Sequence, residues 1–239
     1  MNAHTYASEE VTLSVRETRM ILERILLTTG LPDGFVPAVG NSILYSQAAK
    51  LGGLAAFEAD VDALSKAKLP TVSILGEDPE GIYVDANGNH AWLVSNDALD
   101  LVLARYRTGK SGDLEIRNAL VPFELRVMEA LAYRHGARVK VTVSADGGTL
   151  QVLADGLSEP DAVMDEALRH GFPVPQWLWR SLYDRSGQAL TPDSIESRRH
   201  AGPVMVDAEG RVHGRDDDDT DFELLRGSRA DHPQAREGA

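Results

Sequence analysis

The sequence predicts an α+β protein in which a helical N-terminal unit is followed by antiparallel hairpins packed with helices. Apolar residues recur at helical spacing through the first 65 residues, whereas short β-branched segments follow Pro70. Segments 137–144 and 149–155 alternate with period two around an Asp-Gly-Gly turn, which predicts an antiparallel hairpin. We expect a helical unit over 11–65, a mixed α+β domain over 66–213 and an acidic, disordered tail over 214–239.

The N-terminal unit is expected to contain three helices after a loose lead-in of ten residues. Ser14 and Glu17 form the Ser-x-x-Glu pattern of a capping box, and Gly30 is a suitable stop for the first helix. The second helix is predicted from about Pro37 to Leu51 and the third over 54–64, because each places apolar residues on one face.

The later elements combine strands and amphipathic helices. Strands are predicted at 71–76 and 81–85, and Asn87-Gly88 predicts a hairpin turn joining two strands within 83–94. Helices are expected at 95–106 with Ser95 as N-cap, at 123–136, and at 174–187 with Trp177, Leu178 and Leu182 facing inward. Residues 204–213 predict a last small hairpin.

Composition excludes several classes of function. The chain has no cysteine, which rules out disulfides and cysteine nucleophiles. The formal net charge is −13, which opposes nucleic-acid binding. There is no apolar run of membrane-spanning length and no basic, apolar leader, so we expect a soluble, cytoplasmic protein with no membrane partner.

Motifs that would indicate a known chemistry fail in specific positions. Residues 107–113 end like a phosphate-binding P-loop, but Ala104 replaces its first glycine. Residues 85–96 begin like a calcium loop, yet Asn96 stands where the bidentate glutamate is needed. The histidines show no metal spacing, and the dinucleotide fingerprint Gly-x-Gly-x-x-Gly is absent. No metal is expected, and neither a catalytic residue nor a cofactor is assigned.

The candidate binding segment is 191–203, where Thr191 and Pro192 predict the start of a short helix. The guanidinium of Arg198 could hold a small carboxylate in a bidentate grip. Alternatively, Glu196 pairs with Arg199 on the surface, and the segment is the polar end of a domain. Trp177 could line a pocket or a partner surface, or pack in the core. The candidate ligand-binding or partner-binding residues are Glu196, Ser197, Arg198, Arg199, His200 and Trp177.

Several segments together resemble a bacterial family known as domain of unknown function 3726. The segments are "TLSVRE", "TTGLPDGFVPAVG", "AAKLGGLAAFEADVDAL", "VPQWLWRSL" and "LTPDSIESRRHAG". The resemblance covers most of the chain expected to fold, although "AGPVMVDAEG" departs from the family's Gly-Ala-Gly ending. This family has no established activity, so the resemblance implies a functional region around Ser197 and Arg198 but no reaction.

Residues 12 to about 104 also resemble the N-terminal part of the non-Rossmann malate/L-lactate dehydrogenase family. The order of elements is similar, with "IYVDANGNHAWLVSNDALDLVLA" as strand, turn and helix. That family carries a catalytic histidine in a Ser-His-Gly motif after its second helix. The corresponding stretch here is "KLGGL", without a histidine, and the chain is short for the whole family fold. The resemblance therefore implies related architecture with this chemistry lost.

We therefore expect a non-catalytic accessory subunit or small-ligand-binding protein of small-molecule metabolism. Its partner would be another metabolic protein subunit or a small carboxylate, and a homo-oligomer is possible. The alternative is an NAD(P)-dependent oxidoreductase related to the malate/L-lactate dehydrogenases.

Overall fold

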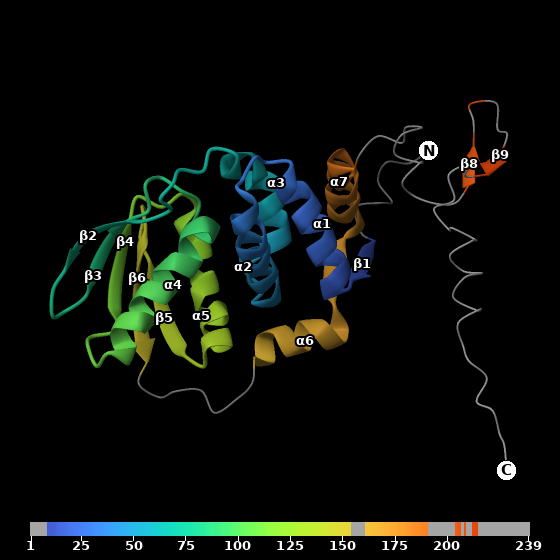
Figure 1. Cartoon of the computed structure of the whole chain (residues 1–239). Helices are drawn as coiled ribbons and strands as arrows, with labels where there is room; N and C mark the ends of the chain where they lie inside the picture. Colours follow the sequence, from blue (N-terminus) through green and yellow to red (C-terminus); the bar gives the residue numbers. More distant parts are fainter. Residues whose placement is uncertain (1–8, 154–160, 191–203, 207, 209–211, 215–239) are drawn as a thin grey trace, which may run out of the picture. The chain divides into compact units, whose positions relative to one another are not determined.

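The computed structural model describes residues 9–153, 161–190, 204–206, 208 and 212–214 (Figure 1). The chain divides into two compact units, Met1–Leu190 and Thr191–Ala239. Helices and a mixed five-stranded sheet share the first unit, which confirms the α+β class. The domain boundaries expected at 65 and 213 remain predictions.

Four helices form a layer in the first unit, and three of them match the expected N-terminal helices. The helices are α1 (Val15–Leu27), α2 (Val36–Ala48), α3 (Gly53–Leu64) and α7 (Gln176–Ser186). The Ser14 hydroxyl accepts a hydrogen bond from the backbone N–H of Glu17 at 3.1 Å, so Ser14 caps α1 as predicted. The spacing of Ile21, Leu22, Ile25 and Leu26 buries one face of this helix completely.

Two short strands lie beside these helices and were not predicted. β1 (Glu10–Leu13) pairs antiparallel with β7 (Phe172–Pro175), so the expected lead-in is partly a strand. The predicted helix at 174–187 begins only at Gln176, because Val174 and Pro175 belong to β7. Helix α6 (Ala162–His170), capped by the Asp161 carboxylate, was also missed.

The main sheet has the order β2-β3-β4-β6-β5. Its strands are β2 (Ser73–Glu77), β3 (Ile82–Asp85), β4 (Asp113–Arg117), β5 (Arg138–Val143) and β6 (Gly148–Leu153). The predicted hairpin of β5 and β6 is confirmed, with Arg138 opposite Leu153 and Val143 opposite Gly148. The predicted strands at 71–76 and 81–85 are confirmed as the antiparallel pair β2 and β3. Strand β4, parallel to β3, was not predicted.

The turn at Asn87-Gly88 does not produce the expected hairpin. Both residues have positive φ, as a tight turn requires, but the chain then enters helix α4 (Ala91–Arg107). The N-cap of α4 is His90 rather than Ser95, and Ser95 lies inside the helix with its hydroxyl donating to the Ala91 carbonyl at 2.7 Å. A crossover helix is needed here because β3 and β4 are parallel, and a two-residue turn cannot join parallel strands.

Helices α4 and α5 (Val127–Leu131) lie on one face of the sheet (Figure 1). The expected helix at 123–136 is broken, because 3-10 segments at Pro122–Arg126 and Ala132–His135 flank α5. Alternate residues of β3, β4, β5 and β6, such as Val84, Ile116 and Leu150, are buried under these helices. The opposite face of the sheet carries no helix among the described residues (Figure 1) and is therefore the surface on which a site can be built.

The second unit contains the antiparallel pair β8 (Val204–Val206) and β9 (Val212–Gly214), which confirms the last predicted hairpin. The expected tail lies outside the described residues except for Gly214, which ends β9. No helix in the described ranges combines the length and apolar character that crossing a bilayer requires.

Candidate functional site

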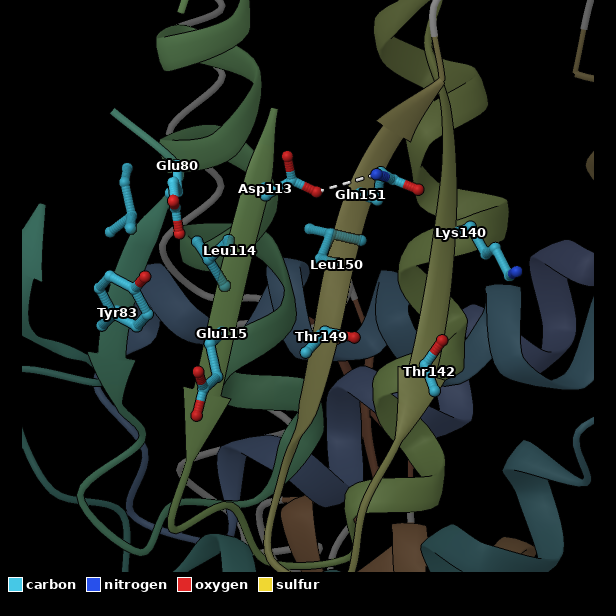
Figure 2. A pocket seen from close by; sticks show the side chains of 12 residues that line it. Glu80, Tyr83, Asp113, Leu114, Glu115, Lys140, Thr142, Thr149, Leu150 and Gln151 are labelled. Carbon is cyan, nitrogen blue, oxygen red and sulfur yellow. Dashed lines mark hydrogen bonds between the residues drawn. The ribbon is translucent and has the colours of Figure 1, made fainter. Parts of the chain in front are cut away.

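The open face of the sheet contains a hollow of about 390 Å³ (Figure 2). It crosses four strands, β3, β4, β6 and β5, and its rim includes the turn between β2 and β3. The side chains that line it are mostly polar: Glu80, Tyr83, Asp113, Glu115, Lys140, Thr142, Thr149 and Gln151.

Strand register places these side chains in two rows across the sheet (Figure 2). The first row follows directly paired positions, from Tyr83 to Glu115, then to Thr149 and Thr142. Directly paired residues project from the same face, so these four side chains are neighbours although they come from four strands. The row exists because β3, β4, β6 and β5 are adjacent, and of these neighbours a local pattern in the sequence predicts only the pair β5 and β6.

The second row runs from Asp113 to Gln151 and Lys140, again through paired positions. The Gln151 amide donates a hydrogen bond to Asp113 at 3.0 Å, which holds both side chains over the hollow (Figure 2). The Ser111 hydroxyl donates to the other oxygen of Asp113. Asp113 is therefore fixed in position by two donors from its own chain.

The charge of the hollow is negative, since Glu80, Asp113 and Glu115 oppose the ammonium group of Lys140. Arg117, beside the hollow, donates from Nε to the Glu115 carboxylate at 2.6 Å, and this hydrogen bond raises the pKa of Arg117. The hydrogen bond of Tyr83 to Asp78 raises the pKa of the Tyr83 phenol. The hollow can therefore offer hydroxyls, carboxylates, an amide and an amine to a polar molecule.

A second polar cluster lies in the interior, between the helical layer and α4. The Glu124 carboxyl group accepts hydrogen bonds from the Ser46 hydroxyl at 2.7 Å and from the Trp92 indole at 2.9 Å. His90 lies next to this cluster, with its ring centroid 4.3 Å from that of Trp92. The exposed fraction of His90 and of Glu124 is 1% each, so this cluster holds elements together and is closed to a substrate.

His90 is held neutral in this interior. Its Nδ1 accepts a hydrogen bond from the Trp92 backbone N–H at 3.2 Å, which places the proton of the neutral ring on Nε2. Among the described residues Nε2 finds no hydrogen-bond partner, and it lies 3.9 Å from the Asp60 carboxylate of α3. Burial lowers the pKa of His90 to about 4, so desolvation outweighs the attraction of Asp60.

The stretch that corresponds in position to the dehydrogenase Ser-His-Gly motif contains two glycines that the fold requires. Gly52 has φ of 87°, a left-handed conformation that side chains disfavour. A Cβ on Gly53 would lie 2.5 Å from the Ile43 carbonyl oxygen. No ionisable side chain occurs between Leu51 and Phe57, so this segment cannot supply an acid or base.

The loops that resemble phosphate and calcium sites use their polar groups internally. Lys110 contacts Glu77 at 2.9 Å, and Arg105 contacts the same carboxylate at 2.5 Å, so neither of these cations is free for a phosphate. The Asp85 carboxylate accepts from the backbone N–H of Asn87 and from the amide of Asn118, closing the turn. The part of the chain that the structure describes contains no group of three metal-ligating side chains.

The predicted binding residues are located only in part. Glu196, Ser197, Arg198, Arg199 and His200 lie outside the described residues. Trp177 is described, and its exposed fraction of 54% shows that its predicted inward orientation is wrong. Leu178 and Leu182, four residues apart, define the inner face of α7, and Trp177 is displaced from that face by the 3.6-residue period. Trp179, on the same helix, packs partly against the core instead.

Comparison with known proteins gives a shared fold and no assigned family. No family model matches the chain, so the resemblance to domain of unknown function 3726 is not supported, and no curated protein matches either. The structure is similar to a dehydrogenase from Sinorhizobium meliloti, with a TM-score of 0.54 and 11% identity, covering 74% of this chain and 100% of that one. This similarity shows the fold that the weaker resemblance implied.

Two malate dehydrogenases are more distant. The enzyme from Entamoeba histolytica has a TM-score of 0.44 and 11% identity, covering 74% of this chain and 62% of that chain. The enzyme from Pyrococcus horikoshii also has a TM-score of 0.44 and 11% identity, with 79% and 68% covered. This chain thus spans less than two thirds of the Entamoeba enzyme.

Proposed function

We propose that this chain is a small-ligand-binding protein that has the dehydrogenase fold and serves small-molecule metabolism without hydride transfer. The observation that carries the proposal is the hollow on the open sheet face, whose two rows of polar side chains converge from four strands. Its volume of about 390 Å³ falls within the range typical of small-molecule sites.

The chemistry of the lining favours one class of ligand. Three carboxylates face Lys140 in the hollow, and Arg117 beside it pairs with one of them, so negative charge remains in excess. A free carboxylate would meet repulsion, whereas hydroxyl or amino groups would find acceptors. We therefore assign to the hollow a neutral or cationic polar molecule rich in hydroxyl or amino groups. The small carboxylate that we expected from Arg198 remains a separate prediction for residues 191–203.

The absence of a catalytic role is supported by the segment around Gly52 and Gly53. Where the dehydrogenase family places its catalytic histidine, this chain has glycines fixed by backbone geometry. His90, an ionisable ring that could otherwise serve as acid or base, is buried and used as a helix cap. Neither this segment nor His90 thus takes the place of the missing histidine.

Filling the hollow should abolish binding. Thr149 is exposed at the centre of the first row, and a tryptophan there would occupy the hollow while suiting a strand. We expect a small molecule to remain on the gently purified wild-type protein, detected by native mass spectrometry, and to be lost from Thr149→Trp. Glu166→Trp, at an exposed position of α6, is the matched control and should retain the molecule. Equal retention by both variants, or a wild-type protein that carries nothing, would count against the proposal.

An NAD(P)-dependent oxidoreductase is the second candidate, favoured by the full coverage of the Sinorhizobium dehydrogenase. It predicts binding of NADH or NADPH at millimolar concentration or below, measured by isothermal titration calorimetry. We expect no heat of binding, because the cofactor phosphates would meet the carboxylates of the hollow, and Arg105 and Lys110 are already paired with Glu77. Saturable binding of either cofactor would favour the oxidoreductase over the non-catalytic ligand-binding protein.

A further inference from the structure

Strand β2 forms one edge of the five-stranded sheet and carries no neighbour on its outer side within the described residues. Figure 1 shows β2 and β3 at the side of the sheet that α4 leaves uncovered. The outward backbone groups of β2 are a template for another strand. Lysine, proline or another charge usually protects such an edge. β2 contains no lysine or proline, and its one charged residue, Glu77, ends the strand and pairs with Arg105 and Lys110 of its own chain.

Two aliphatic side chains are exposed on this edge. The exposed fraction of Ile74 is 60% and that of Leu75 is 57%. Ile74 is paired with Val84, which is fully buried, so Ile74 points to the same face as Val84 but beyond the cover of α4. Leu75 is the extra residue of a β-bulge between Ile74 and Gly76, and it has no partner on β3.

We propose that β2 pairs antiparallel with β2 of a second copy of this chain, joining two sheets across a two-fold axis. An antiparallel edge can pair with its own copy, because a two-fold axis perpendicular to the sheet reverses the strand and preserves its faces. With Ile74 opposite Leu75 of the partner copy, both apolar residues gain an apolar neighbour. The Ile74 side chains of both copies then lie on the same face of the joined sheet.

The charges along β2 are compatible with a second copy. In that register, Glu77 faces Val72 of the second copy, so no like charges oppose each other directly. The Glu77 carboxylate is already neutralised by Arg105 at 2.5 Å and Lys110 at 2.9 Å within its own chain. The remaining opposition is the net charge of −13 on each copy, so the dimer should tighten as salt screens this repulsion.

The test is the oligomeric state of the full chain, measured by sedimentation velocity over a wide concentration range. The wild-type protein should form a dimer, and Ile74→Lys should raise the dimer dissociation constant by about a hundredfold, since each copy loses the burial of an isoleucine. Ile74 lies largely in solvent in the single chain, so this variant keeps its core, and circular dichroism checks that it folds.

Leu168→Lys is the matched control, because Leu168 is a similarly exposed aliphatic residue on α6. It should leave the dissociation constant unchanged. The proposal is overturned if the wild-type chain stays monomeric up to high micromolar concentration. It is equally overturned if Ile74→Lys leaves a dimer intact, or if Leu168→Lys weakens it as much.

Discussion

Acidification from about pH 7 to about pH 4 should lower the free energy of unfolding of the wild-type protein by about 3 kcal/mol more than that of the His90→Asn variant. Burial lowers the pKa of His90 from 6.5 to about 4. Below about pH 6.5 the histidine of the unfolded chain takes up a proton, whereas the buried ring does so only near pH 4. The contribution of the neutral His90 to the free energy of unfolding is therefore fully present above pH 6.5 and is lost as the pH falls toward 4.

Asparagine is the informative substitution because it also accepts hydrogen bonds at a helix N-cap and does not titrate in this range. The measurement is urea unfolding at a series of pH values, comparing how the unfolding free energies of the two proteins change with pH. Asp60, whose pKa is raised by burial, favours folding at low pH, but it is present in both proteins. A parallel pH dependence would show that His90 is accessible to protons in the folded state.

Replacing Glu124 by leucine should lower the free energy of unfolding by about 3 kcal/mol, because buried donors without acceptors each cost about 1–3 kcal/mol. The Trp92 indole N–H and the Ser46 hydroxyl would both lose their acceptor in the interior. The serine can turn to a backbone carbonyl of its own helix, so the tryptophan bears most of the cost. Thermal and urea unfolding measure the loss.

Glu124→Gln is the matched variant, since both hydrogen bonds end on the same oxygen, Oε2, and an amide oxygen in its place can still accept both. It should be clearly milder than Glu124→Leu, and Ser46→Ala should cost about 1 kcal/mol because only one donor is removed. If leucine proved as stable as the wild type, Glu124 would not be needed to join α2 to α4. Such a result would indicate that Glu124 has a functional role instead of a structural one.

Features that depend on neighbouring residues in the chain were predictable. The N-cap at Ser14 was predicted from a four-residue pattern, and the β5–β6 hairpin from alternation around a tight turn. The turn at Asn87-Gly88 was also located correctly, because its positive φ angles suit these two residues. The element after this turn was predicted wrongly as a strand, since a turn does not specify whether a strand or a helix comes next.

The sequence by itself determined the α+β class, the first three helices and the hairpin, because each rests on local periodicity, caps or turn chemistry. Only the tertiary structure decided the order of the sheet, the hollow and the buried cluster. Tyr83 and Glu115 become neighbours through a parallel pairing across a whole helix, and Glu124 meets Ser46 and Trp92 from distant segments. Such contacts depend on which faces of the helices and the sheet pack together when the chain folds. Many core residues determine this packing together, so no single motif in the sequence predicts it.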